Sequence, residues 1–271
     1  MSLQIRCEFE AGFHRDLDEE LYHSDANSLS STGAKTILKS PALFRHQQDH
    51  PEHKDAYDVG TAFHTKTLGV GPDIAVWDGP SFYSKAGREF QAEARAEGKT
   101  PITATDDAHT TGMAQEVHNS AVAAPWLAGD PEVSAFAPDA LTGVMRRGRF
   151  DILGDTFLGD LKSTKDASPR AFAKSAAQFR YHQQAAWYLD IAAALGHPAL
   201  GMAFVVVEKT PPYFLSVIEL DEEAIELGRD LNSRALEVYA RCVETDTWPG
   251  YTPSGYTTVS LPRWAFKEVE E

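Results

Sequence analysis

The segment that most constrains the fold is GRFDILGDTFLGDLKST, at residues 148–164. Two apolar stretches of strand length flank the pair Gly154-Asp155, and a Gly-Asp pair favours a two-residue β-turn. The segment therefore predicts a β-hairpin. Its strands also carry Asp151, Asp160 and Lys162 among apolar residues, and these three side chains need an explanation.

The spacing of the hairpin determines which of its charged side chains meet. Because side chains alternate along a strand, Asp160 and Lys162 point to the same face. With a two-residue turn, Asp151 faces Leu158 and sits diagonally from Asp160, about 7–8 Å away at the backbone. Two carboxylates at that separation repel, so they require a cation between them or full exposure to water. Mg²⁺ suits the position because it prefers oxygen ligands and binds through one or two carboxylates.

Lys162 adds a positively charged ammonium group to this candidate metal site. A metal lowers the pKa of a bound water and polarises a phosphate, while an ammonium can hold the attacking water or stabilise the charge on phosphorus. The hairpin therefore indicates metal-dependent cleavage of phosphodiesters. The alternative is an exposed hairpin whose acids and lysine form a solvated face, since D-x-K tripeptides are common.

The rest of the chain mixes helices and strands. We expect helices at 57–69, 111–124, 170–195 and 221–243, a β region from Glu132 to Lys162, and strands at 202–208 and 213–220. Residues 70–110 are expected to be loop and surface helix. This order predicts an α/β fold. We expect one domain over residues 1–271, with an N-terminal helical extension at about 20–56 and a loop-like tail at about 245–271.

Composition excludes several functions. The 271 residues are 42% hydrophobic, which supports a sizeable core. A net charge of −15 argues against coating nucleic acid through bulk electrostatics, although a local basic groove remains compatible with it. Two cysteines are too few for a four-thiolate zinc or iron–sulfur site. The sequence lacks a signal-peptide layout and a membrane-length apolar run, so we expect a cytoplasmic protein without a membrane partner.

The ordered set of motifs resembles the PD-(D/E)XK nuclease superfamily, in particular its RecB-like and RecE-like (exodeoxyribonuclease VIII-like) exonuclease branch. In that branch an acid, a (D/E)-x-K strand and a Q-x-x-x-Y helix follow a histidine in a G-x-x-x-H setting. Here these are Asp151, Asp160-Leu161-Lys162, Gln184 with Tyr188, and Gly60 to His64. The segment YHSDANSLSSTGAKTILKSPALF also resembles the opening of RecE-like nuclease domains of phages and prophages. The resemblance covers roughly residues 20–240.

The resemblance implies a restriction-endonuclease-like core, with a central mixed β-sheet flanked by helices. It implies that Asp151 and Asp160 bind Mg²⁺, or Mn²⁺, and that His64 and the backbone carbonyl of Leu161 add ligands. Lys162 would be the catalytic lysine, and Gln184 would join it at the catalytic site. The role of Glu132 stays open, and Phe150 replaces the proline of the family motif.

DNA contacts are the remaining site prediction. Tyr181, Gln184 and Tyr188 have spacings of three and four, which place them on one helix face. In the resembling family that face looks toward the DNA, although the tyrosines could equally pack on the sheet. Ser163 and Thr164 could contact a phosphate or cap the next helix. Basic residues on both sides of the hairpin form a possible phosphate track, with ordinary salt bridging as the alternative: Arg146, Arg147, Arg149, Lys165, Arg170 and Lys174.

By resemblance, the chain is a bacterial or phage-encoded Mg²⁺-dependent exonuclease. It would degrade linear double-stranded DNA from its ends, 5′ to 3′, and leave single-stranded tails for a single-strand annealing recombinase. Relatives form rings, so a homo-oligomer is expected, and a basic channel would reconcile the net charge with DNA binding. The alternatives are an endonuclease, a single-strand-specific nuclease, or a non-catalytic DNA-binding or assembly module. The sequence itself leaves polarity, end preference, oligomer number and processivity open.

Overall fold

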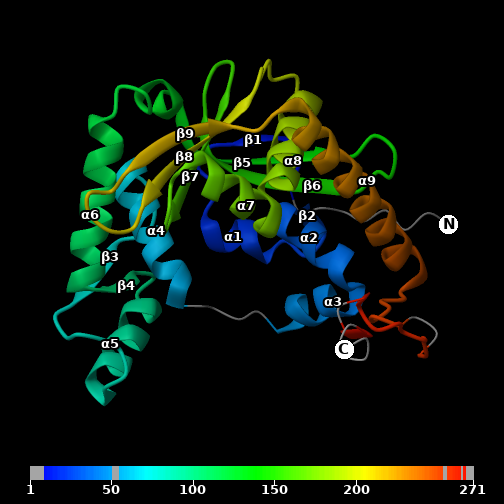
Figure 1. Cartoon of the computed structure of the whole chain (residues 1–271), viewed down its shortest axis with the longest axis horizontal. Helices are drawn as coiled ribbons and strands as arrows, with labels where there is room; N and C mark the ends of the chain where they lie inside the picture. The colour runs from blue at the N-terminus through cyan, green and yellow to red at the C-terminus, as the bar shows by residue number, and fades with distance from the viewer. Residues whose placement is uncertain (1–8, 51–54, 253–254, 264, 267–271) are drawn as a thin grey trace.

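A computed structural model describes residues 9–50, 55–252, 255–263 and 265–266, with side chains from residue 58 onward in the second range (Figure 1). A mixed sheet runs in the order β1-β5-β6-β7-β8-β9, and β2 pairs with β6. Its strands are β1 (Gly12–His14), β2 (Leu29–Ser30), β5 (Asp130–Pro138), β6 (Met145–Leu153), β7 (Leu158–Thr164), β8 (Met202–Glu208) and β9 (Leu215–Glu219). The β7–β8 and β2–β6 pairs are parallel and the others antiparallel.

The described residues also form helices. They are α1 (Glu19–Ser24), α2 (Ser31–Lys39), α3 (Pro41–Asp49), α4 (Asp55–Leu68), α5 (Lys85–Ala96), α6 (Ala104–Asn119), α7 (Pro169–Phe179), α8 (Tyr181–Ala194), α9 (Glu222–Thr245) and the 3-10 helix η1 (Ala124–Leu127). The expected strands at 202–208 and 213–220 and the expected helix at 221–243 are confirmed to within two residues at each end. None of the helices in the described residues is long and apolar enough to cross a membrane.

The prediction for residues 70–110 was wrong in one respect. A second, two-stranded parallel sheet forms there from β3 (Ile74–Trp77) and β4 (Thr100–Thr103). Figure 1 shows this small sheet beside α4, with α5 lying beyond it. Helix α6 also begins earlier than expected, because the Thr103 hydroxyl accepts the backbone N–H of Asp106 and caps it.

The two faces of the main sheet carry separate apolar clusters. Strand β8 alternates between them, with Phe204 packed against α7, α8 and α9 and Val205 packed against α4 and α6. On the neighbouring strand β7, Leu161 belongs to the cluster on the α4 side. Alternation therefore places Asp160 and Lys162 on the opposite face of β7, toward α7 and α8.

The hairpin loop is longer than the predicted two-residue turn. It spans Gly154–Phe157, and the Gly154 N–H donates to the Phe157 carbonyl at 3.1 Å. The ring of Phe157 packs edge-on against Trp126, 5.1 Å between centroids, which anchors the loop by a contact that the turn motif does not reveal. The strands pair from the residues that flank this loop, and extending that register by one pair puts Asp151 directly opposite Asp160.

The predicted single helix at 170–195 is two helices. Helices α7 and α8 meet at Arg180, which has a left-handed backbone with φ of 55°. Neither Gly nor Pro marks this break in the sequence. Helix α8 begins at Tyr181 and packs so closely on α9 that a Cβ at Gly228 would collide with the carbonyl oxygen of His182.

Candidate active site

Three carboxylates, those of Glu132, Asp151 and Asp160, occupy opposing positions on three adjacent strands of the sheet. Strands β5 and β6 pair with Val133 opposite Phe150, so the same register places Glu132 opposite Asp151. Asp151 is in turn opposite Asp160 on β7. Glu132 has φ of 51°, a left-handed conformation that costs energy for a residue other than glycine and tends to occur at functional sites.

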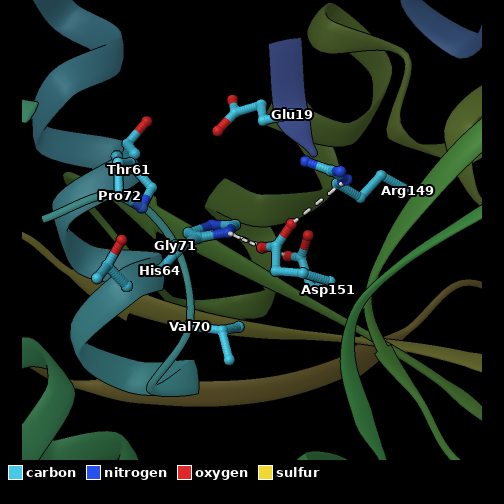
Figure 2. Close-up of a pocket in the computed structure, with 11 residues that line it drawn as sticks. Glu19, Thr61, His64, Val70, Gly71, Pro72, Arg149 and Asp151 are labelled. Carbon is cyan, nitrogen blue, oxygen red and sulfur yellow. Dashed lines mark ion pairs between the residues drawn. The ribbon is translucent and has the colours of Figure 1, made fainter. Parts of the chain in front are cut away.

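Two of these acids converge on His64, which helix α4 supplies. One potential ligand atom from each of His64, Glu132 and Asp151 lies within 4.8 Å of the others. We call these three residues the metal-ligand cluster. His64 Nδ1 is 3.5 Å from Asp151 Oδ2 and 3.9 Å from Glu132 Oε1, and Figure 2 shows the first pair pointing toward one another. His64 Nε2 is 3.2 Å from the carbonyl oxygen of Leu161.

The pKa values in the metal-ligand cluster show that its two carboxylates lack sufficient positive charge to balance them. Burial lowers the pKa of His64, but Asp151 and Glu132 outweigh this effect and raise it to about 9. Burial raises the pKa of Asp151, although His64, Lys162 and the backbone N–H of Leu161 at 2.7 Å oppose the shift. Protonated His64 thus partly neutralises two crowded acids. Carboxylates, an imidazole and a main-chain carbonyl are also donors that suit Mg²⁺ or Mn²⁺, so the residues fit a divalent cation.

Asp160, Lys162 and Gln184 form a second group, which we call the lysine cluster. Asp160 is only 1% exposed, and its Oδ2 accepts a hydrogen bond from Lys162 Nζ. Its Oδ1 accepts one from Gln184 Nε2 at 2.6 Å. Burial raises the pKa of Asp160 to about 6 against the opposing effect of Lys162. Burial lowers the pKa of Lys162, but Asp160 and Asp151 reverse that shift and keep it charged.

The backbone of Leu161 connects the two clusters. The backbone N–H of Leu161 donates to Asp151 Oδ2, and its carbonyl faces His64 Nε2. The Leu161 side chain is buried on the α4 side of the sheet, while Asp160 and Lys162 flank it on the chain. A displacement of β7 would therefore change both clusters together.

The two candidate tyrosines occupy different environments. The ring of Tyr181 lies between two ammonium groups, 5.2 Å from Lys162 Nζ and 6.0 Å from Lys35 Nζ. Tyr188 is packed edge-on against Phe150, 5.1 Å between centroids, and burial raises its pKa well above the usual value. The structure thus places Tyr181 at the lysine cluster and Tyr188 within the packing of α8 on the sheet.

Lys35 on α2 is a candidate that the sequence analysis missed. Burial and then Lys162 lower its pKa to about 8, and Arg180 adds to the effect. Lys35, Lys162 and Arg180 thus concentrate positive charge beside Asp160 in a protein whose net charge is −15. The only sequence signal was the position of Lys35 in the serine-rich segment that resembles RecE-like domains.

Arg149, Ser163, Thr164 and Lys165, four of the expected DNA contacts, lie in different environments. Arg149 lies over the metal-ligand cluster, but its guanidinium already donates to Ser134 Oγ at 3.0 Å and to the Leu17 carbonyl. The Thr164 hydroxyl contacts the backbone of Asp166 within a local turn. Ser163 is partly buried, and Lys165 is exposed.

A cavity of about 360 Å³ opens beside the metal-ligand cluster (Figure 2). Helix α4 contributes Thr61 and Thr65 to its wall, α1 contributes Glu19, and Arg149 closes one side. All three members of the metal-ligand cluster line it, so a ligand in this active-site cavity would reach them directly. Asp160 and Lys162 do not line the cavity.

A family model described as a PDDEXK-like domain of unknown function (DUF3799) matches residues 30–257. The crystal structure of a protein from Eubacterium rectale, described as a candidate exonuclease, has a TM-score of 0.62 at 11% identity. That alignment covers 94% of this chain and 98% of the other, and at this identity it shows a shared fold. No curated protein matches the chain significantly.

Two further solved structures are more distant. LHK-Exo in complex with dAMP has a TM-score of 0.29 at 14% identity, covering 84% of this chain and 97% of that one. LHK-Exo is described as an alkaline exonuclease from Laribacter hongkongensis. Rai1 from Scheffersomyces stipitis has a TM-score of 0.31 at 10% identity, covering 96% and 84%. TM-scores this low do not show a shared fold.

Proposed function

The chain belongs to the PDDEXK-like family DUF3799, and from this premise we propose that it is a metal-dependent exonuclease that degrades linear double-stranded DNA. Family membership and the shared fold confirm the nuclease superfamily and the restriction-endonuclease-like core that the motifs indicated. The observation that supports the activity best is the junction of the metal-ligand cluster and the lysine cluster at Leu161.

Mg²⁺ is the proposed cofactor, with Mn²⁺ as a substitute. His64, Glu132, Asp151 and the carbonyl of Leu161 would hold it, since these donors already converge. Asp160 remains a proposed ligand because it is the neighbour of Asp151 in the sheet, although one of its oxygens would have to exchange the hydrogen bond from Lys162 or Gln184 for the cation. When bound, the cation would supply the charge that polarises the phosphate and lowers the pKa of a water.

Lys162 is the proposed catalytic lysine. Asp160 keeps its ammonium charged, Gln184 holds Asp160 in place, and the ring of Tyr181 covers one side. A positively charged group fixed in this way can hold the attacking water or neutralise charge that develops on the phosphate. Because the groups are positioned before the substrate arrives, little reorganisation is needed during the reaction.

Several residues around the two clusters are proposed to bind DNA. Lys35 and Arg180 would contact a phosphate beside the lysine cluster, while Arg149, Ser163, Thr164, Lys165, Tyr181 and Tyr188 are further proposed contacts. We also propose 5′-to-3′ polarity, a role in making single-stranded tails for a single-strand annealing recombinase, and a ring-shaped homo-oligomer. A ring would confine the positive charge to a channel and leave the outer surface acidic.

The deciding experiment measures nucleotide release from linear duplex DNA with Mg²⁺, with Mn²⁺ and with EDTA. Comparing duplexes labelled at the 5′ end with duplexes labelled at the 3′ end determines the polarity of degradation. Covalently closed circular DNA tests whether the enzyme requires a free end. We expect metal-dependent release from linear DNA, 5′ label first, and intact circles. Cleavage of the circles would establish the endonuclease alternative, whereas binding without cleavage would establish a non-catalytic DNA-binding module.

A further inference from the structure

A second cavity, of about 590 Å³, lies between the N-terminal half of α4, helix α5 and strand β4. We call it the α5 cavity. Its wall includes Asp58 from α4, Tyr83 from the loop before α5, Arg88 and Gln91 from α5, and Asp106 from α6. A cavity of this size is typical of a small-molecule or nucleotide site. None of its lining residues belongs to either cluster of the candidate active site.

Gln91 is an unsatisfied polar group in this wall. Its side chain is only 8% exposed, and its amide Nε2 has no hydrogen-bond partner among the described residues. A buried donor without a partner is destabilising, and such groups are uncommon in native proteins unless a ligand completes them. The Nε2 atom is closed off from solvent, but a half-turn of the amide exchanges it with the oxygen, so Gln91 can present either a donor or an acceptor to the edge of a ligand.

The loop before α5 presents an aromatic ring at this cavity. The ring of Phe82 stacks with Phe90, and Trp77 packs against the same ring with 5.3 Å between centroids. The indole N–H of Trp77 also donates to the carbonyl of Ser81 at 3.2 Å, which fixes the loop. Tyr83 follows directly and is 90% exposed. An exposed aromatic ring on a fixed loop is the kind of platform on which nucleic-acid bases stack.

The charges of the α5 cavity favour a neutral group inside and an anion at the rim. Asp58 is paired with Arg95 at 2.8 Å, whereas Asp106 accepts the Thr103 hydroxyl at 2.7 Å and keeps its negative charge, so the interior would repel an anion and suits an uncharged group. Arg88 is exposed and has no ion-pair partner in the described part of the chain. A nucleotide has this distribution, because its base is neutral and its phosphate is negative.

The position of the α5 cavity connects it to the active-site cavity. Asp58 lines the first and His64 lines the second, on the same helix. Val59 also lines the α5 cavity and the adjacent Gly60 lines the active-site cavity, so the two cavities approach each other along α4.

We propose that the α5 cavity binds a nucleobase of a DNA strand that also reaches the active-site cavity. Tyr83 stacks on the base, Gln91 hydrogen-bonds its edge, and Arg88 contacts the adjoining phosphate. The part of the inference that places the same strand in the active-site cavity rests on the proposed nuclease function, whereas base binding itself does not.

The test measures binding of a fluorescent single-stranded oligothymidine to the full chain in EDTA, by anisotropy. An abasic oligonucleotide of equal length and charge separates base recognition from phosphate attraction. We expect the wild type to bind the oligothymidine about tenfold more tightly than the abasic strand. Tyr83→Ala and Gln91→Leu should abolish this preference. The matched control is Tyr251→Ala, which removes another exposed tyrosine, 74% exposed, and should leave the preference unchanged.

Equal binding of the two strands by the wild type would overturn the inference. An unchanged preference in Tyr83→Ala would do the same, and because Tyr83 is exposed this variant should fold even if Gln91→Leu does not. Complete competition by thymidine monophosphate at equimolar concentration would overturn the assignment to a strand, since the cavity would then be a mononucleotide site. Nucleotide release with Mg²⁺ but no base preference would refute this inference alone, and base preference without nucleotide release would refute the proposed function alone.

Discussion

The two clusters of the candidate active site differ in how their charge is balanced. In the lysine cluster both oxygens of Asp160 are engaged, one by Lys162 and one by Gln184, so the group is complete within the chain. The metal-ligand cluster holds two crowded carboxylates and must recruit a proton onto His64 to reduce their repulsion. The difference indicates that the first cluster is already arranged for chemistry, while the second needs a cation to become active.

The largest expected effect follows from removing the charge of Lys162. Lys162→Gln keeps a donor for Asp160 but loses the ammonium, so we expect nucleotide release to fall about 100- to 1,000-fold. Mn²⁺ affinity, measured by calorimetry, should change little because the metal-ligand cluster is intact. Lys209→Gln, at an exposed lysine just after β8, is the matched control and should retain activity. A loss of metal affinity equal to the loss of activity would show that the two clusters do not have separate roles.

Glu132→Gln should lower metal affinity, whereas Lys162→Gln should lower activity and leave metal affinity nearly unchanged. The substitution keeps the shape of the side chain and removes one carboxylate from the metal-ligand cluster, so Mn²⁺ affinity should fall about 10- to 100-fold. Activity should recover at saturating Mn²⁺, because the lysine cluster is unaffected. Glu116→Gln, on α6, provides a control at an acid outside the metal-ligand cluster. Failure of Mn²⁺ to restore activity would assign Glu132 a role beyond metal binding.

The pH dependence of metal binding tests the protonated state of His64. A metal ligand must be the neutral imidazole, whereas the pKa of about 9 means that His64 is protonated near neutral pH in the metal-free protein. Raising the pH removes this proton, so Mn²⁺ affinity should rise about tenfold per pH unit from about pH 7 and level off above about pH 9. The slope should disappear in His64→Gln. A flat profile in the wild type would contradict the assignment of His64 as a ligand.

The smallest effect is expected at Lys35. Lys35→Gln removes a partly buried charge beside Lys162 without touching either cluster, so we expect KM for DNA to rise a few-fold with kcat nearly unchanged. The salt dependence of binding should also weaken by about one phosphate contact. Lys39→Gln, one turn further along α2 at an exposed position, is the control. A fall in kcat at constant KM would instead place Lys35 in the chemical step.

The sequence was sufficient to predict the parts of the site that depend on local pattern. The alternation of β7 determines that Asp160 and Lys162 share a face, and the G-x-x-x-H spacing placed His64 on a helix. Gln184 was predicted at the site from the resemblance, and the structure brings it within hydrogen-bond distance of Asp160. Its catalytic role remains a prediction.

The remaining parts depend on contacts between distant segments. Glu132 reaches the cluster through strand register and a left-handed backbone, neither of which is visible in PEVSAF. Lys35 approaches Lys162 only because α2 packs against α8. Neither Gly nor Pro marks the break at Arg180, and although Gly154-Asp155 signals a turn, the packing of Phe157 on Trp126 that accompanies the longer loop is not visible in local propensity.

The position of a bound metal tests the proposed site most directly. Anomalous diffraction from crystals grown with Mn²⁺ locates the ion independently of activity. We expect a peak within coordination distance of His64, Glu132 and Asp151, close to the carbonyl oxygen of Leu161. A peak elsewhere, or none at Mn²⁺ concentrations that support nucleotide release, would contradict the proposed site.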